Sequence, residues 1–302
     1  MNVIELDHIT KTYGTHKAVD DLTLHVPKGS IYGFIGPNGS GKTTTIRMIM
    51  NILYPDSGNI KLFGRESIGS TLEHVGYLPE ERGLYKKMKV KDLVKFHGEL
   101  KNVKNLDEAA DAWLKKFDLS KWADKKVEAL SKGMAQKVQF IITVIDEPEI
   151  IILDEPFSGL DPVNAEIIKE VILKLRDKGS TVIFSTHDMS VAEKMCDYIF
   201  MIYQGKKVLD GTLNSIQEKF GHDTIRIQAE NGVRAVDGIP GIEKVNDFGQ
   251  VLEIRMAPGA DSQKILNAIM AKSRVSKFEL TSPSLNDIFI RIARPEKNES
   301  HE

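Results

Sequence analysis

The sequence predicts an α/β fold whose core is a mainly parallel sheet carrying a phosphate-binding loop. Residues 150–153 form a continuous apolar run bounded by charged residues, and residues 181–186 form a second, mostly apolar run. Such runs are typical of central parallel strands, which are buried on both faces. A third run, 30–35, leads into the glycine-rich stretch 36–43 and then into a helical pattern over 44–53. A strand, a glycine loop and a helix in this order are the context that phosphate binding requires.

The glycine-rich stretch has the residue types needed to hold an anion, and we expect it to bind nucleotide phosphates. Its glycines let backbone N–H groups curl around the anion, and the following helix adds donors and partial positive charge at its N-terminus. We expect Lys42 to reach the β- and γ-phosphates and the Thr43 hydroxyl to ligate Mg²⁺. The alternative is a chance match in a glycine-rich turn. The candidate nucleotide-binding residues here are Gly36, Pro37, Asn38, Gly39, Ser40, Gly41, Lys42, Thr43 and Thr44.

The composition is ordinary for a soluble globular protein with room for two domains. The chain has 302 residues, of which 41% are hydrophobic and 28% charged. Its net charge of −2 provides no basic field for nucleic acid or an anionic membrane. A single cysteine excludes an internal disulfide framework. No stretch resembles a signal peptide, and no apolar run approaches the ~18–20 residues that span a bilayer. We therefore expect a chain that is soluble by itself and has no nucleic-acid partner.

Polar residues follow both buried runs, at the edge where parallel sheets bind ligands. Asp154 is expected to hold Mg²⁺ through water, and Glu155 is placed to polarise a water for attack on the γ-phosphate. His187 is expected to orient the γ-phosphate and this water. The alternatives are strand-terminating charges for the two carboxylates and a satisfied loop residue for the histidine. The phosphate loop upstream favours the catalytic interpretation.

A predicted helical region downstream of the glycine-rich stretch and an aromatic residue upstream of it are further features of the sequence. Residues 91–122 predict an insertion of helices between the strands, and Ser131 is a good N-cap for a further helix. Upstream, we expect residues 11–14 to form a loop that carries Tyr13. An aromatic side chain near a nucleotide site can stack on the base, whereas an ordinary surface tyrosine is the alternative.

The character of the sequence changes in its last quarter. We expect residues 1–220 to form the nucleotide-binding domain, with a helical subdomain at about 84–145, and residues 221–302 to form a small α+β domain with a polar tail. If residues 232–236 make a helical turn, the second domain has the order β-α-β-β-α-β of a ferredoxin-like fold. Its sequence contains no phosphate loop, no cluster of metal ligands and no nucleophile–base pair.

Together these motifs resemble those of the ATP-binding subunits of ABC transporters. All of the family's motifs occur here in the family's order, which makes the match very specific. The resemblance covers about 1–220 and implies an ABC-type P-loop ATPase, with an antiparallel β part beside the parallel sheet, that hydrolyses ATP with Mg²⁺. The motifs are the base-stacking Tyr13, the Walker A loop 36–43, the Q-loop 77–80, the signature 130–136, the Walker B strand 150–154 with catalytic Glu155, the D-loop 158–161 and the switch histidine His187.

The resemblance also implies a dimer with composite sites. In the family two subunits pack head to tail, so Ser131 and Gly133 of one subunit would face the γ-phosphate held by the other. A helix beginning near Ser131 directs its positive N-terminal end at that anion, and Gly133 permits close approach. The D-loop adds Asp161 to the candidate nucleotide-binding residues. The second subunit is expected to be another copy of this chain or a paralogue.

Two positions depart from the family's pattern. Glu80 replaces the usual glutamine of the Q-loop, which normally contacts Mg²⁺ and water and senses the membrane partner. A carboxylate can still meet Mg²⁺, but it adds negative charge beside the phosphates. Lys132 replaces a common glycine of the signature and either adds a phosphate contact or points into solvent. The catalytic pair is intact, so we expect an active ATPase with Thr43, Asp154 and Glu80 at its metal site.

The resemblance names a membrane permease as the partner. We expect the permease to dock on residues 84–128 and the Glu80 loop, which places the chain peripherally at the cytoplasmic face of the cell membrane. Residues 282–289 resemble the C-terminal extension of the export-type subfamily that includes sodium-efflux ATPases. Export is therefore the expected direction of transport. The resemblance implies that the permease selects the substrate.

Two other functions have to be weighed against a transporter ATPase. One is a soluble ABC-type ATPase acting on ribosomes or DNA. Translation factors of this class carry two ATPase domains, and DNA-repair relatives insert a long coiled coil between Q-loop and signature; this sequence has neither. The other is a nucleotide-binding regulator without turnover, which Glu155 and His187 argue against.

Overall fold

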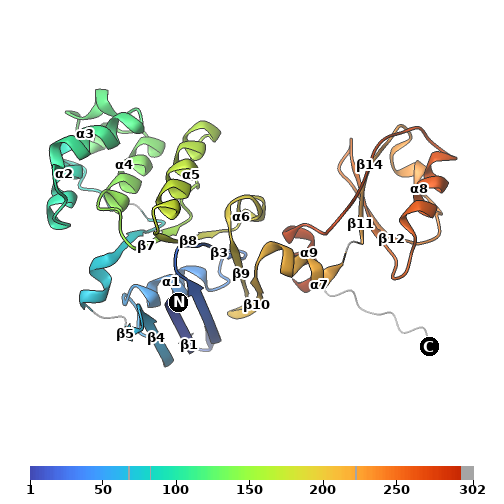
Figure 1. Ribbon diagram of the computed structural model, residues 1–302, viewed down its shortest axis with the longest axis horizontal. Helices are drawn as coiled ribbons and strands as arrows, with labels where there is room; N and C mark the ends of the chain where they lie inside the picture. Colours follow the sequence, from blue (N-terminus) through green and yellow to red (C-terminus); the bar gives the residue numbers. More distant parts are fainter. Residues whose placement is uncertain (67–68, 82, 222, 294–302) are drawn as a thin grey trace. The chain divides into compact units, whose positions relative to one another are not determined.

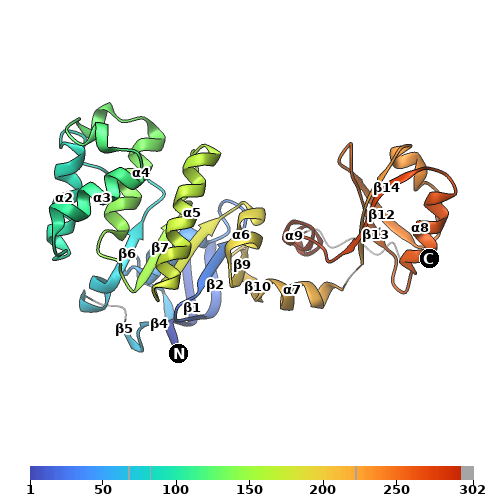
Figure 2. The same ribbon diagram turned by 45° about the horizontal axis from the view of Figure 1, so that its top comes forward.

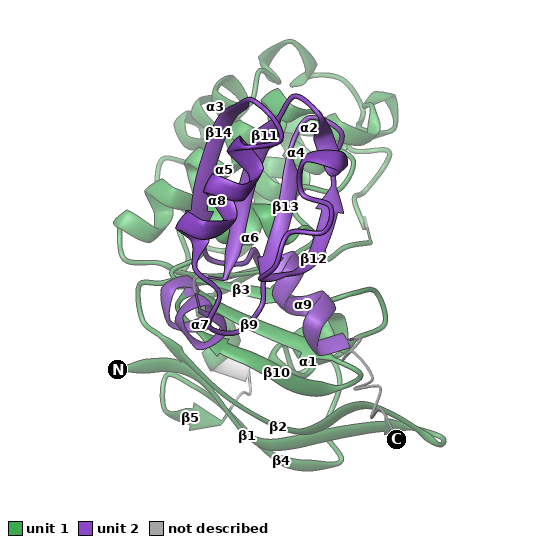
Figure 3. Cartoon of the chain, turned by 90° about the vertical axis from the view of Figure 1, so that its right-hand side faces the viewer, with its two compact units in different colours: residues 1–212 green, residues 213–302 purple. Residues whose placement is uncertain are grey.

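The computed structural model divides the chain into two compact units, residues 1–212 and 213–302 (Figure 3). The polar tail expected at the end of the chain lies outside the described residues. Within the described part of the chain, no helix combines the length and the hydropathy needed to cross a bilayer. The residues that the structure describes are 1–66, 69–81, 83–221 and 223–293.

The first unit is built on a six-stranded sheet. Its strands are β3 (Ile31–Ile35), β6 (Val75–Leu78), β7 (Ile150–Asp154), β8 (Thr181–Thr186), β9 (Tyr198–Tyr203) and β10 (Lys206–Gly211). They lie in the order β10-β9-β3-β8-β7-β6. All pair in parallel except β10, which forms an antiparallel hairpin with β9. Every residue of β7 and β8 is buried, as the apolar runs predicted.

A second, antiparallel sheet covers one face of the first. Its strands are β1 (Asn2–Tyr13), β2 (His16–Pro27), β4 (Ser57–Leu62) and β5 (Arg65–Glu66), in the order β2-β1-β4-β5. Helix α1 (Lys42–Ile49) packs in the apolar core between the two sheets. Helices α4 (Lys132–Val144), α5 (Pro162–Asp177) and α6 (Met189–Met195) pack on the opposite face of the six-stranded sheet. Helices α2 (Val90–Leu100) and α3 (Leu106–Lys116) pack against α4 and complete the helical layer (Figures 1 and 2).

Local sequence explains where the longer helices begin. The Ser131 side chain accepts a hydrogen bond from the N–H of Met134 at the start of α4, and the Asp161 side chain accepts one from the N–H of Asn164 at the start of α5. Each bond satisfies one of the N–H groups that a helix leaves unpaired at its N-terminus. The predicted caps at both positions are confirmed.

The hairpin at the N-terminus corrects one expectation. Residues 11–14 were expected to form a loop, but β1 extends through Tyr13, which pairs with His16 across a two-residue turn. Gly14 takes the positive φ of 58° that this turn needs. The strand continues because its backbone groups find partners on β2, an interaction that local sequence does not reveal.

Helix α4 sits directly on strand β6. A side chain at Gly76 would place its Cβ only 2.4 Å from the carbonyl oxygen of Thr143. The Thr143 hydroxyl donates to the carbonyl oxygen of Gln139, 2.9 Å away, within the same helix. At the other face of the helical layer, the Lys137 ammonium donates to the carbonyl oxygen of Phe117 across 2.8 Å. The Thr143 hydroxyl also lies 3.4 Å from the carbonyl oxygen of Tyr77 on β6, so α4 contacts the backbone of both its neighbours.

The second unit contains a four-stranded antiparallel sheet with the expected ferredoxin-like topology. The strand order is β12-β13-β11-β14, and a 3-10 turn at Gly232–Ala235 stands where the first helix was expected. Helix α8 (Ser262–Met270) and this turn pack on one face of the sheet. The other elements are α7 (Leu213–Phe220), β11 (Thr224–Ala229), β12 (Ile242–Asp247), β13 (Leu252–Met256), β14 (Val275–Thr281) and α9 (Leu285–Ala293).

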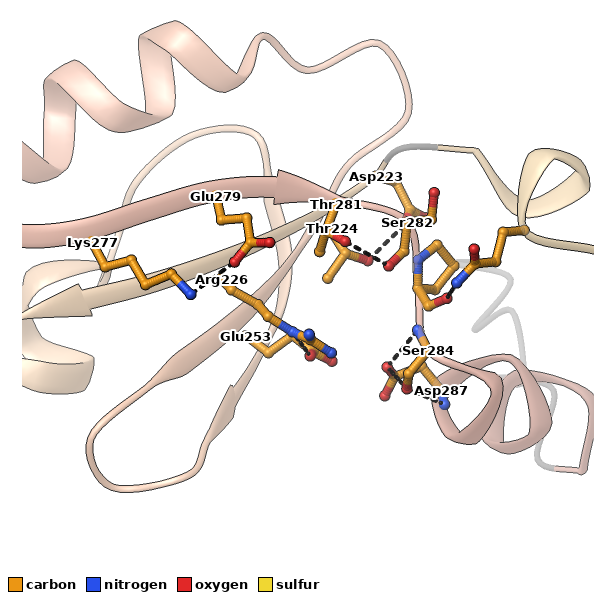
Figure 4. A network of polar contacts seen from close by, with 12 residues as sticks. Asp223, Thr224, Arg226, Glu253, Lys277, Glu279, Thr281, Ser282, Ser284 and Asp287 are labelled. Carbon is orange, nitrogen blue, oxygen red and sulfur yellow. Dashed lines mark hydrogen bonds and ion pairs between the residues drawn. The ribbon is translucent and has the colours of Figure 1, made fainter. Parts of the chain in front are cut away.

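Polar residues line the other face of this sheet (Figure 4). The Arg226 guanidinium lies 3.1 Å from the Glu253 carboxylate on the neighbouring strand. Burial raises the pKa of Glu253, although Arg226 opposes the shift. At the start of α9, Ser284 and Asp287 cap each other's backbone N–H groups. The alternation of apolar and polar residues in these strands thus buries one face and leaves the other polar.

The close packing of α4 on β6 predicts that a methyl group added at Gly76 destabilises the fold. Gly76→Ala should lower the free energy of unfolding by about 1–3 kcal/mol, because the new Cβ overlaps the backbone of α4. Gly83→Ala is the matched control, since nothing lies within 4 Å of its Cβ position. Thermal unfolding followed by circular dichroism measures both. Equal melting temperatures for the two variants would contradict this packing.

Candidate functional site

A cavity of about 450 Å³ opens at the carboxyl edge of the parallel sheet. It brings together residues from the first hairpin, the glycine loop, the end of β7 and the segment after β6. Most of the predicted site residues line it, together with His16 and Ala18, which the sequence did not indicate. The predicted residues in its wall are Tyr13, Asn38, Gly39, Gly41, Lys42, Thr43, Thr44, Glu80, Asp154 and Glu155.

Two glycines let the loop fit its surroundings. A Cβ at Gly36 would lie 2.3 Å from the carbonyl oxygen of Ile202, and one at Gly41 would lie 2.4 Å from that of Ala18. Both glycines also have positive φ, 151° and 114°. Since neither the space nor the backbone conformation suits a side chain, only glycine fits at these positions. The chain then enters α1 with Lys42 as its first residue.

The Lys42 ammonium is held inside the loop. It donates to the carbonyl oxygens of Gly36 at 2.7 Å and Pro37 at 3.1 Å, and the residue is only 6% exposed. Burial lowers its pKa, whereas the nearby carboxylates of Glu155, Asp154 and Glu80 raise it. A cation is thus fixed next to the loop, where a bound phosphate would sit.

Asp154 has the features expected of a carboxylate that faces a metal-bound water. It ends β7, is 2% exposed, and accepts a hydrogen bond from the Ser185 hydroxyl through Oδ1. Its other oxygen, Oδ2, is buried without a hydrogen-bond partner. A buried carboxylate oxygen is costly to leave unpaired. The residue therefore fits a site in which a hydrated cation supplies the missing partner.

Glu155 and His187 lie side by side. The His187 Nδ1 atom is 3.0 Å from the Glu155 Oε1 atom, and the Glu155 side chain is only 11% exposed. Glu155 adopts a left-handed φ of 51° directly after the strand, and its N–H donates to the Ser185 hydroxyl at 3.1 Å. Ser185 thus contacts both acidic residues. The available sequence signal for it was a hydroxyl at the carboxyl end of a mostly apolar strand, where Thr186 carries another.

Several predicted residues lie outside the wall of this cavity. Ser131 is exposed at the start of α4, and Gly133 has only Leu160 near its Cβ position. Asp161 caps α5. In this single chain the structure does not bring these three residues to the loop. Gly36 and Pro37 also lie outside the wall, and their carbonyl oxygens accept hydrogen bonds from the Lys42 ammonium. The Ser40 hydroxyl is buried without a hydrogen-bond partner.

Two buried glutamines tie α4 to the acidic segments. The Gln136 side chain donates to the carbonyl oxygen of Pro156 at 2.6 Å, and the Gln139 side chain donates to that of Pro79 at 3.5 Å. Pro156 follows Glu155, and Pro79 precedes Glu80. The sequence analysis included Gln136 in the signature 130–136 and did not single out Gln139. Their three-residue spacing, which puts them on one helix face, was the available signal.

Comparison with known proteins identifies the family. Residues 19–158 match the family described as "ABC transporter", and residues 211–293 match "ATP-binding protein DrrA1-3-like, C-terminal domain". An uncharacterised ABC transporter ATP-binding protein of Bacillus subtilis, YhaQ, is 41% identical over 95% of this chain and 97% of its own length. This chain belongs to the ABC transporter ATP-binding family.

Other similarities agree with this assignment. The Nod factor export ATP-binding protein I of Paraburkholderia xenovorans is 31% identical over 96% of each chain. A solved ATP-binding subunit of an ABC transporter superposes with a TM-score of 0.69 at 28% identity, over 72% of this chain and 93% of that one. The predicted fold class and family are confirmed. As an ABC subunit the chain binds and hydrolyses ATP to energise a transporter, and the soluble alternative is not favoured.

The contacts of Ser185 predict a specific defect. Ser185→Ala should lower kcat about tenfold, because Asp154 loses its hydroxyl donor and the Glu155 N–H loses its acceptor. Ser180→Ala is the control: it removes a buried hydrogen bond to the carbonyl oxygen of Pro148 at the far end of the strand. Both variants should lose similar stability, and only Ser185→Ala should lose turnover. Equal ATPase rates would refute the role of Ser185.

Proposed function

We propose that this ABC subunit drives export with MgATP and works as a dimer with two composite sites. The observation that carries the proposal is the cavity in which the Walker A loop faces the carboxylates of Asp154 and Glu155. A nucleotide whose phosphates lie on this loop has a metal site and a base beside its γ-phosphate. These are the components that phosphoryl transfer to water requires.

The loop and Lys42 would bind the phosphates. The N-terminal end of α1 directs N–H groups and partial positive charge toward this position. The Lys42 ammonium would exchange its two carbonyl acceptors for phosphate oxygens, which form stronger, charge-assisted hydrogen bonds. Tyr13 lines the same cavity, and 48% of the residue is exposed. Its ring face is therefore available to stack on the base.

Thr43, Asp154 and Glu80 would hold Mg²⁺ together with the nucleotide. Thr43 is the second residue of α1, and Asp154 offers its unpartnered Oδ2 oxygen. Among the described residues, no group of three or more metal-binding side chains is preformed. Phosphate oxygens and water must then complete the coordination, as is usual for Mg²⁺. The ion, when bound, neutralises charge on the β- and γ-phosphates.

Glu155 and His187 would carry the catalytic step. Glu155 accepts the proton of the water that attacks the γ-phosphate, which is the role of a general base. Its contact with His187 fixes the direction of the carboxylate and brings the imidazole to the same edge. Low exposure of the Glu155 side chain keeps the base close to the cavity rather than in bulk water.

Ser131, Gly133 and Asp161 would complete the site of a second ATPase subunit. All three lie outside the wall of this chain's own cavity. The N-terminal end of α4 is exposed, and its first turn contains no acidic residue. It can therefore face a phosphate held by the partner without like-charge repulsion. The partner is another copy of this chain or a paralogue, arranged about a twofold axis.

A membrane permease would dock on the helical subdomain, residues 84–128, and the Glu80 loop. Exposed apolar side chains gather in this region: Tyr85 is 57%, Phe96 37% and Leu100 64% exposed, and the two aromatic rings form an edge contact. The subunit would lie at the cytoplasmic face of the membrane and contact no nucleic acid. The export direction is supported by relatives named for export.

Mutation should separate ATP binding by the loop of one chain from turnover in the composite site. Lys42→Ala should weaken ATP binding at least about a hundredfold, because the loop loses its cation. Ser131→Ala should leave ATP binding by the monomer unchanged and lower turnover about ten- to a hundredfold, because it removes a donor aimed at the partner's phosphate. Calorimetry and phosphate release measure the two effects. Equal loss of ATP affinity in both variants would count against the composite site.

Removal of the base gives a second test. Glu155→Gln should lower the hydrolysis rate by about 10²–10⁴-fold and leave MgATP binding intact, so that ATP-induced dimers accumulate in light scattering. Glu149→Gln removes the same charge just before the same strand, where Glu149 contacts Lys28 at 3.5 Å, and should retain normal turnover. A Glu155→Gln variant that hydrolyses ATP as fast as the parent would overturn the assignment.

A further inference from the structure

Three carboxylates line the nucleotide cavity. Strands β6 and β7 pair in parallel with Leu78 opposite Leu153, so the segments that follow them emerge at the same edge of the sheet. Glu80 comes from the first segment, and Asp154 and Glu155 come from the second. All three line the nucleotide cavity and also a neighbouring cavity of about 340 Å³. Glu80 therefore shares the lining of both cavities with the two acidic residues of Walker B.

The charges in the cavity wall are unbalanced. Among the described residues that line it, Lys42 is the only lysine or arginine, and it faces Glu80, Asp154 and Glu155. The wall thus carries an excess of two negative charges. The usual glutamine in place of Glu80 would halve this excess. ATP itself brings further negative charge to the same space, so each added carboxylate repels the nucleotide unless a cation lies between them.

A second observation points to a cation. The Oδ2 oxygen of Asp154 is buried and unpartnered, and the residue is 2% exposed at the cavity wall. Neither Lys42 nor any other described side chain satisfies this oxygen, because the Lys42 ammonium is directed to the carbonyl oxygens of Gly36 and Pro37. A bound cation could therefore pair with the Oδ2 oxygen of Asp154, for which the described residues supply no partner.

We infer that Glu80 makes nucleotide binding conditional on a divalent cation, so that this subunit discriminates between MgATP and free ATP. This inference rests on the proposed MgATPase function and adds a specificity role to Glu80. With Mg²⁺ in the site, Glu80 attracts the ion and offsets its own repulsion of the phosphates. Without Mg²⁺, only the repulsion acts. A neutral glutamine at this position would neither attract the ion nor repel the phosphates. Removing the charge should therefore reduce the preference for MgATP over free ATP.

The test measures binding rather than turnover. The probe is adenylyl imidodiphosphate, a non-hydrolysable ATP analogue, titrated calorimetrically in Mg²⁺ and in EDTA at fixed ionic strength. The quantity of interest is the ratio of the dissociation constant in EDTA to that in Mg²⁺. Glu80→Gln should lower this ratio about fivefold, which is the size of effect expected for one solvent-exposed charge near a polyphosphate.

Glu81→Gln is the matched control. Glu81 carries the same charge one position further along and lines only the neighbouring cavity. It should leave the ratio at the parent value, which shows that local placement and not net charge is responsible. An unchanged ratio in Glu80→Gln, or an equal change in Glu81→Gln, would overturn the inference while leaving the proposed function intact. Failure of the parent chain to bind the analogue in Mg²⁺ would instead overturn the proposed function.

Discussion

The register of three parallel strands is the constraint on which the site depends. In the central sheet Ile35 of β3 lies opposite Thr186 of β8, and Ser185 of β8 lies opposite Asp154 of β7. The glycine-rich loop 36–43, His187 and the carboxylates of Asp154 and Glu155 therefore leave the sheet at one edge and at one level. A slip of one residue in either pairing would turn alternate side chains to the other face and separate these groups. Burial of all three strands on both faces holds the register.

The same edge concentrates charge of both signs. Lys42 is enclosed by its loop, while Asp154 and Glu155 sit at the end of a buried strand with Ser185 between them. Groups of this kind are expensive to desolvate, and a fold tolerates them where ligand binding satisfies them. The cavity wall keeps unbalanced charges and an unpaired carboxylate oxygen in the absence of a ligand. A nucleotide and its cation would supply the missing partners.

Helix α4 connects this pocket with a distant surface. Its exposed first turn carries Ser131 and Gly133, and its buried middle turns contact the segments of Glu155 and Glu80 through Gln136 and Gln139. The helix also packs closely on the backbone of β6 at Gly76, so these contacts all belong to one element of the core.

The sequence by itself determined the features that depend on local backbone chemistry. The Walker A glycines, the caps at Ser131 and Asp161 and the wholly buried strands were predictable, because each follows from residue type at a fixed spacing. The ferredoxin-like order of the second unit followed from its alternating pattern. The tertiary structure alone decided which distant groups meet. It made Tyr13 part of a strand, brought His16 into the cavity and placed Ser185 between two carboxylates, because strand pairing and register are set by long-range contacts.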